Sequence, residues 1–404
     1  MYEEPGYQAT PTEEVIVHMV FAIITYQYGV RNWADAVQRS HLNDQSNNHY
    51  HYSLSKFPDL MTSRDLEAVQ AMTLIAAHTR AFPKPGCGSL ISNLAFQRAL
   101  EMNLPREPKN KPASGTNLGI EMRKRTWWTL LSLCVSTTGR RGRPMVITVE
   151  EFDTSFPEPI ADELLTEEGV DESKSEEVAC GFEVGLATFK IIPIMMEMYS
   201  NIYSVRVDAA NYPKIVYALE KQLQDWEDNL PASLKMDQAT NDQPHLALAP
   251  LYVRMFGLEM RIWLRHNSVN PTKDPKMIMD NTRICEETAR EYLHTVQQVI
   301  ELKSLDTTWT QASIYAMSLF SMLVAHWERR RETTPEQVTI LRQEMNEWLA
   351  VFDELGQLMG SFSSPGSEDC VPENMSFFLL FFLILTVYNR FRPGSSRPDF
   401  QHCG

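Results

Sequence analysis

The sequence predicts an all-α protein, a large multi-helix domain with antiparallel helix packing and little or no sheet. Glycine makes up only 17 of the 404 residues, which disfavours β-hairpins and glycine-rich phosphate loops. Apolar residues recur with the helical period along most of the chain, and no set of strand-like runs alternates with period two. With 43% hydrophobic residues, a chain of this length buries a sizeable core without disulfides or metals.

The first half of the chain contains four predicted helices. The first opens with a capping box, Thr10-Pro11-Thr12-Glu13, which has proline at the first helical position. A polar stretch over 43–52 then breaks the helical pattern. The other three helices are expected from Thr62 or Ser63, over 90–103 and over 120–138.

The chain is predicted to form two helical halves of one domain, 1–160 and 178–390, joined by an acidic linker loop over 161–177. From 158 to 177, nine acidic residues stand against one lysine, which is typical of a solvated loop. A disordered tail is expected over 391–404. The helices expected in the second half cover about 180–203, 208–229, 250–266, 281–302, 309–331, 335–359 and 375–390.

Charge and cysteine spacing restrict the partners of the chain. A formal net charge of −15 repels phosphate backbones, so we do not expect this chain to bind DNA. Six cysteines lie 33 to 105 residues apart, without metal-ligand spacing, which favours free buried thiols in a reducing compartment. The longest apolar run, 377–388, is shorter than the roughly 20 residues of a membrane-spanning helix. We therefore expect no cofactor or metal in this chain, no membrane segment and, since no basic leader opens it, no signal peptide.

No catalytic motif emerges, so we do not predict an enzyme. Gly86-Cys87-Gly88 begins a dinucleotide-binding pattern, but Ile91 occupies the position of the third glycine, and a turn between helices is favoured. His49 and His51 have metal-ligating side chains but no third ligand near them in sequence, which favours positions in a linker or at a helix start. His326 lies in an apolar helix, where a hydrogen-bonded core histidine is expected.

The segment 121–159 carries the most informative residues. A basic run, 123–125, directly precedes a pair of tryptophans, and Gly142-Arg143-Pro144 follows the first tryptophan by fifteen residues. Side chains of adjacent helical residues point about 100° apart, so one tryptophan is expected in the core and the other against a neighbouring helix. Glycine permits the helix to end, proline fixes an extended exit, and the arginine between them can reach helix carbonyls or a carboxylate.

Six residues of this segment are therefore candidate signature residues, structural by default and alternatively part of a regulatory or partner surface: Arg125, Trp127, Trp128, Gly142, Arg143 and Pro144. Two basic clusters are expected to end helices or to pair with acidic neighbours: 123–125, with Arg140, Arg141 and Arg143 after it, and 329–331. The acidic residues close enough in sequence to serve as partners are Glu121, Glu150, Glu151 and Asp153.

This order of segments resembles the core signature of the fungal-specific transcription factor domain, the middle homology region of fungal zinc-cluster transcription factors. Upstream, 65–71 and 96–104 are similar to two helices of that family, and the resemblance extends diffusely to about 330. Two positions depart from the family pattern: Cys134-Val135 in the tryptophan helix, and Asn103-Leu104-Pro105 after the preceding one.

The resemblance implies a nuclear regulatory domain that controls transcription by RNA polymerase II in response to a metabolite or a protein partner. Full-length family members bind DNA through a binuclear zinc cluster of six closely spaced cysteines, and the cysteines of this chain cannot form one. Zinc and DNA are therefore expected only through a separate module. A homodimer or a full-length regulator is the expected protein partner.

Two further expectations follow from the resemblance. The alternative function is a stand-alone interaction protein that dimerises with full-length regulators and titrates them. A small-molecule effector pocket is expected, if anywhere, among the methionines and aromatic residues of the second half, which otherwise belong to the core. Its candidate residues are Met195, Met198, Trp309 and Phe320.

Overall fold

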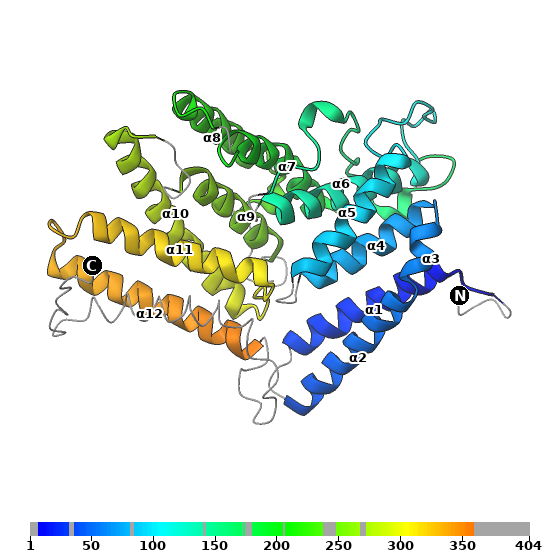
Figure 1. The fold of residues 1–404 in the computed structure, drawn as a ribbon, viewed down its shortest axis with the longest axis horizontal. Helices are drawn as coiled ribbons and strands as arrows, with labels where there is room; N and C mark the ends of the chain where they lie inside the picture. Colours follow the sequence, from blue (N-terminus) through cyan, green and yellow to red (C-terminus); the bar gives the residue numbers. More distant parts are fainter. Residues whose placement is uncertain are drawn as a thin grey trace, which may run out of the picture. The chain divides into compact units, whose positions relative to one another are not determined.

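The structure is a computed structural model that describes residues 7–31, 36–80, 85–139, 143–171, 173, 180–204, 207–236, 248–266 and 272–358. This part of the chain contains twelve α-helices and no β-strand (Figure 1). An isolated backbone bridge between Leu165 and Val170 is its only β-type pairing. The all-α prediction is therefore confirmed.

The first half contains six α-helices and two short 3-10 helices: α1 (Pro11–Arg31), α2 (Ala36–Ser55), α3 (Phe57–Thr62), α4 (Leu66–Thr79), α5 (Pro85–Glu101), α6 (Leu118–Gly139), η1 (Val149–Glu151) and η2 (Asp162–Leu164). Helices α1 and α2 lie side by side, and α1 also packs on α4. Helix α4 packs on α5 and α6, which contact each other.

The second half contains six more α-helices and one 3-10 helix: α7 (Glu183–Asn201), α8 (Tyr212–Asp228), η4 (Ala232–Leu234), α9 (Leu248–Arg265), α10 (Pro275–Glu301), α11 (Trp309–Glu328) and α12 (Pro335–Leu358). Helix α7 packs on α6, and α9 packs on α7, α8 and α10. Helix α10 then contacts α11 and α12. The helices expected over 180–359 are present, and the one expected over 375–390 lies outside the described residues.

One hydrophobic cluster runs through the helices from α1 to α10. By its contacts the chain divides after Gly360, and the residues beyond lie outside the described part, as does the tail expected over 391–404. The boundaries drawn at 160 and 178 stay predictions. The acidic stretch between them is less solvated than expected, because Ala161, Leu164 and Leu165 are buried.

The polar stretch 43–52 is helical, which corrects the expected break in the pattern. It belongs to α2, and its side chains bond to α1: Ser46 donates to the Ala22 carbonyl at 2.7 Å, and the Nδ1 atoms of His49 and His18 are 3.0 Å apart. Contacts with α1 therefore stabilise this helix in place of an apolar face of its own. His49 and His51 consequently lie within a helix and not in a linker.

Of two expected helix starts, one is confirmed and the other differs. The predicted capping box is present in α1, where the Thr10 amide donates to Glu13 at 2.8 Å. Helix α4, however, is capped by Asp65, which accepts from the Ala68 amide at 2.8 Å, and not by Thr62 or Ser63. Aspartate is as good an N-cap as serine, and its position sets the first turn.

The thiols that the structure describes are free. Cys134 and Cys285 are buried, and burial raises the pKa of both to about 12, so neither forms a thiolate at neutral pH. Cys180 is only half-buried, unlike the expectation of burial. The side chains of the other three cysteines lie outside the described residues.

No helix in the described ranges is both long and apolar enough to span a membrane. The apolar run 377–388 lies outside those ranges.

Candidate functional site

Both signature tryptophans are buried in the core beneath α6. Trp127 packs against Phe96 of α5, with ring centroids 5.5 Å apart. Trp128 stacks on Phe156 at 4.3 Å, and its indole Nε1 donates to the Ser155 carbonyl at 3.0 Å. Trp127 thus anchors a neighbouring helix, and Trp128 fixes the extended segment that follows the signature.

The three basic residues before the tryptophans contact three different parts of the fold. Arg123 donates to the Met102 and Asn103 carbonyls at the end of α5, each at 3.2 Å. Lys124 is buried, with its Nζ 3.6 Å from a Glu121 oxygen. Arg125 pairs with Asp162 and donates to the Ile160 carbonyl at 3.1 Å.

The buried Glu121 carboxylate also holds the segment after the signature. One oxygen accepts from the Thr116 hydroxyl at 2.7 Å, and the other accepts from the Glu158 amide at 2.9 Å. Of the acidic partners expected for the basic run, only Glu121 contacts it, because Asp153 instead accepts from the Glu107 amide at 2.9 Å. Asp162, which the sequence did not suggest, is the partner of Arg125.

The Gly-Arg-Pro part of the signature is more exposed than the tryptophans. Gly142 lies outside the described residues. Pro144 and Arg143 are exposed, and Arg143 reaches back as expected: its amide donates to the Thr138 carbonyl at 3.2 Å, and its guanidinium lies 3.4 Å from the Ser89 hydroxyl. No carboxylate contacts it among the residues described.

Gly139, at the end of α6, has a packing role that the sequence did not reveal. A Cβ atom at this position would come within 1.9 Å of the Tyr199 ring on α7. Only glycine therefore permits α6 and α7 to approach so closely, and this contact joins the two halves of the described chain.

The structure describes the side chains of three of the four residues proposed for an effector pocket, two on α7 and one on α11. Met195 and Met198 are buried in the core on α7. Phe320 is half-buried on α11, and Trp309, the first residue of α11, has a side chain outside the described part. None of the four lines the cavity described next or two further cavities found within the described part of the chain. Their role stays a prediction.

A cavity of about 320 Å³ lies between helices of both halves, and we call it the central cavity. One face of each of four helices lines it: Thr73 and Ala77 of α4; Thr129, Ser132 and Ser136 of α6; Thr188 and Phe189 of α7; Tyr252, Phe256 and Glu259 of α9. Asp306, between α10 and α11, and Gln311 of α11 complete the polar part of the lining. Its volume lies within the range of small-molecule sites.

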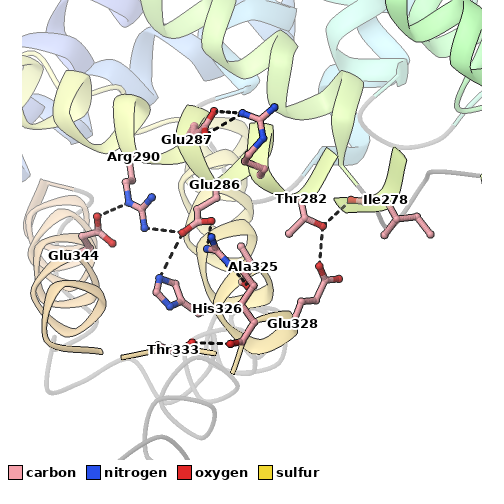
Figure 2. Close-up of polar contacts among 12 residues, drawn as sticks. Ile278, Thr282, Glu286, Glu287, Arg290, Ala325, His326, Glu328, Thr333 and Glu344 are labelled. Atoms are coloured by element: carbon pink, nitrogen blue, oxygen red, sulfur yellow. Dashed lines mark hydrogen bonds and ion pairs between the residues drawn. The ribbon is translucent and has the colours of Figure 1, made fainter. Parts of the chain in front are cut away.

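A charged network joins α10, α11 and α12 (Figure 2). The buried Glu286 carboxylate receives Arg290 at 2.7 Å and also pairs with Arg329, and Arg290 reaches Glu344 on α12 at 2.6 Å. His326 Nε2 lies 3.5 Å from Glu286 but makes no hydrogen bond there, contrary to the expectation for this histidine. Burial lowers the pKa of His326, so the imidazole is neutral at neutral pH and this contact is no ion pair.

The remaining arginines of the second basic cluster belong to the surface of α11. Arg330 stacks on the ring of Trp327, with its guanidinium carbon 4.5 Å from the centroid, and Arg331 is exposed. This cluster ends a helix and pairs internally, as expected. Among the described residues, no group of three or more His, Cys, Asp or Glu side chains is arranged to hold a metal ion.

The structure thus defines an all-helical module with a central cavity. Its signature residues hold the extended segment that follows them against the core. Comparison with known proteins identifies the family. The model of the fungal specific transcription factor domain matches residues 2–228, more than half of the chain. The chain belongs to this family, as its resemblance to the family signature predicted, and it is a domain of the kind that regulates transcription.

Curated relatives are fungal transcription regulators. "Activator of stress genes 1" of Saccharomyces cerevisiae is 25% identical over 255 residues, 63% of this chain and 26% of that protein. "Transcriptional activator protein acu-15" of Neurospora crassa is 31% identical over 147 residues, 34% of this chain and 16% of that protein. "Transcription factor phm2" of Pyrenochaetopsis sp. is 29% identical over 178 residues, 43% of this chain and 22% of that protein.

The chain therefore spans about a quarter or less of the length of these three relatives. No solved structure matches it.

Proposed function

We propose that this chain is the regulatory part of a nuclear regulator of RNA polymerase II transcription, and that it acts by binding rather than by catalysis. The family match over 2–228 carries the proposal. DNA contact belongs to a separate zinc-cluster module, since this chain has a net charge of −15. A second copy of the chain, or a full-length regulator, is its protein partner.

The proposed input is a small-molecule effector that binds in the central cavity. Helices α4 and α6 of the first half and α7 and α9 of the second half line this cavity. A ligand in contact with all four favours one arrangement of these helices over others, and this differential affinity is what regulation by a ligand requires.

A reporter experiment in yeast tests the proposed function. The chain is fused to a heterologous DNA-binding domain, and a reporter with matching sites is measured in media of different composition. We expect the fusion to change the reporter level relative to the DNA-binding domain alone, and the size of the change to depend on the medium. A reporter that stays at the level of the DNA-binding domain in every medium, with the fusion present in the nucleus, contradicts the proposal.

The alternative function, titration of full-length regulators, gives a different result in the same cells. Expression of the unfused chain would then lower the output of a full-length family member, while the fusion would leave the reporter unchanged.

A further inference from the structure

The side chains that line the central cavity indicate what kind of molecule it binds. We propose that the cavity binds a small organic amine with an apolar, ring-sized body, its ammonium group held by Asp306 and by hydroxyl oxygens of the helices. This inference rests on the proposed function for its regulatory meaning, but the binding itself can be measured on the purified chain.

Four of the hydroxyls that line the cavity offer it acceptors and no donors. Thr73 and Ser132 donate to the Val69 and Trp128 carbonyls of their own helices, at 2.7 and 2.6 Å. Ser136 and Thr188 do the same, to Leu133 at 3.1 Å and Val184 at 2.9 Å. Because each hydroxyl hydrogen is already used, only oxygen lone pairs remain for a ligand.

The donors of two other lining residues are also used within the fold. Tyr252 donates its hydroxyl to the Ser304 carbonyl, and burial raises the pKa of this phenol to about 12, so it stays neutral. Gln311 donates its Nε2 to the Tyr292 hydroxyl, which leaves its Oε1 as an acceptor. A ligand that satisfies this wall must therefore bring donors of its own.

Two carboxylates add negative charge to the same wall. Asp306 accepts the Thr308 amide on one oxygen at 2.8 Å, and its second oxygen has no donor within the described part of the chain. Glu259 is almost completely buried and has contacts within the fold. Arg80, which also has contacts of its own, is the only guanidinium among the described lining residues. An ammonium group supplies both the donors and the charge that this wall favours.

The rest of the lining favours an apolar body. Phe189, Phe256 and Ile192 also border the cavity. Aromatic faces attract cations as well as apolar groups, so they suit an organic amine better than a hydrated metal ion. A volume of about 320 Å³ accommodates a ring with a short chain.

A matched pair of probes tests the ligand class on the purified full chain. 3-Phenylpropylamine and 3-phenylpropionate share their hydrocarbon body and differ in the charge of the head group. We expect the amine to bind with a dissociation constant of roughly 0.1–1 mM, as is usual for about ten heavy atoms, and the acid to bind at least about tenfold more weakly. Isothermal titration calorimetry and ligand-observed NMR measure both. Equal binding of the two probes, tighter binding of the acid, or no binding of the amine overturns the proposal.

Conservative variants locate the binding site. Asp306→Asn keeps an oxygen for the Thr308 amide but removes the charge, and we expect amine binding to weaken by about tenfold. Asp353→Asn on the exposed surface of α12 is its control. Thr188→Val removes one cavity acceptor at constant shape, and its control is Thr339→Val, which loses a similar hydroxyl bond to its own helix, at 3.0 Å, on the exposed side of α12.

The comparison is valid only if the variants have the melting temperature of the parent chain, which is measured by circular dichroism. Amine binding that is unchanged in Asp306→Asn and Thr188→Val places the site elsewhere and overturns the proposal. The reporter fusion is scored separately: an amine that binds in the cavity while the reporter never responds contradicts the proposed function but not the ligand class.

Discussion

His78 shows how a single buried residue sets a pH dependence. Its imidazole is 4% exposed, packed near the rings of Tyr26 and Tyr50 with centroids 5.9 and 5.4 Å away. Burial lowers the pKa of this histidine to about 4. The unfolded chain, with a pKa near 6.5, therefore takes up a proton at a higher pH than the folded chain does.

We predict that the His78 contribution to stability is fully present above about pH 6.5 and falls by about 3 kcal/mol as the pH drops to about 4. Urea unfolding of the parent chain and of His78→Gln from pH 4 to 8 measures it. The parent should lose more stability on acidification than the variant. His51→Gln, at an exposed position of α2, is the control and should retain the parent's slope; identical slopes for all three proteins would contradict the prediction.

Trp127 and Arg143 belong to the same signature, yet their substitutions should lower the free energy of unfolding by different amounts. Trp127 is fully buried against Phe96, so Trp127→Ala should destabilise the fold by about 3–5 kcal/mol. Arg143 is exposed with one long contact to Ser89, so Arg143→Ala should change stability by no more than about 0.5 kcal/mol. Chemical denaturation compares them. If Arg143→Ala melts like the parent but abolishes reporter regulation, its exposed side chain is a partner surface.

At the scale of elements, one buried ion pair contributes to the contact of α6 with the segment after the signature. Glu121 is fully buried, accepts the Glu158 amide and faces the buried Lys124. Glu121→Ala leaves the lysine charge without its partner, and we predict a loss of about 3–5 kcal/mol. Adding Lys124→Met should recover part of that loss, because the uncompensated charge is removed.

The unfolding free energies of the two single variants and the double variant measure the coupling between these residues. A double variant less stable than Glu121→Ala would show that Lys124 contributes mainly through its packing. Limited proteolysis provides a second measurement, since cleavage within 152–165 should accelerate in Glu121→Ala.

The helices differ in how far the sequence predicted them, and the reason is physical. Helix α6 has both a strong apolar pattern and a clear end, so it was placed within two residues at its start. Helix α2 has almost no apolar periodicity, because hydrogen bonds of Ser46 and Tyr52 to α1 replace a hydrophobic face. Local pattern cannot reveal a helix whose stabilisation comes from another helix.

In the candidate site too, features with a local sequence pattern were predictable, and features that depend on contacts between distant residues were not. The spacing of Trp127 and Trp128 predicts one ring in the core and the other against a neighbouring helix, and both are buried. The Arg125–Asp162 pair, in contrast, joins residues 37 positions apart and has no local signal. The hydroxyls of Ser132 and Ser136 lie on a helix that also supplies many core residues, so their place on a cavity wall depends on how four helices meet. Such a site is visible only in the folded chain.

At the scale of the whole molecule, the negative net charge of this chain disfavours binding to DNA. The net charge is −15, and the exposed arginines of the 329–331 cluster are partly paired with Glu286 and stacked on Trp327. Specific DNA binding needs several phosphate contacts from unpaired lysines and arginines, which release counterions and make affinity fall steeply with salt.

We therefore predict that purified 1–404 does not shift duplex DNA at moderate salt, over a range of sequences and up to about 10 µM protein. This concentration lies within the usual range of non-specific dissociation constants of DNA-binding proteins, roughly 10⁻⁴–10⁻⁶ M. A fusion of the chain to a heterologous DNA-binding domain should shift DNA, with the sequence specificity and salt dependence of that domain. A sequence-dependent shift by the unfused chain would mean that this domain itself binds DNA specifically. That result would contradict the proposal that DNA contact belongs to a separate module.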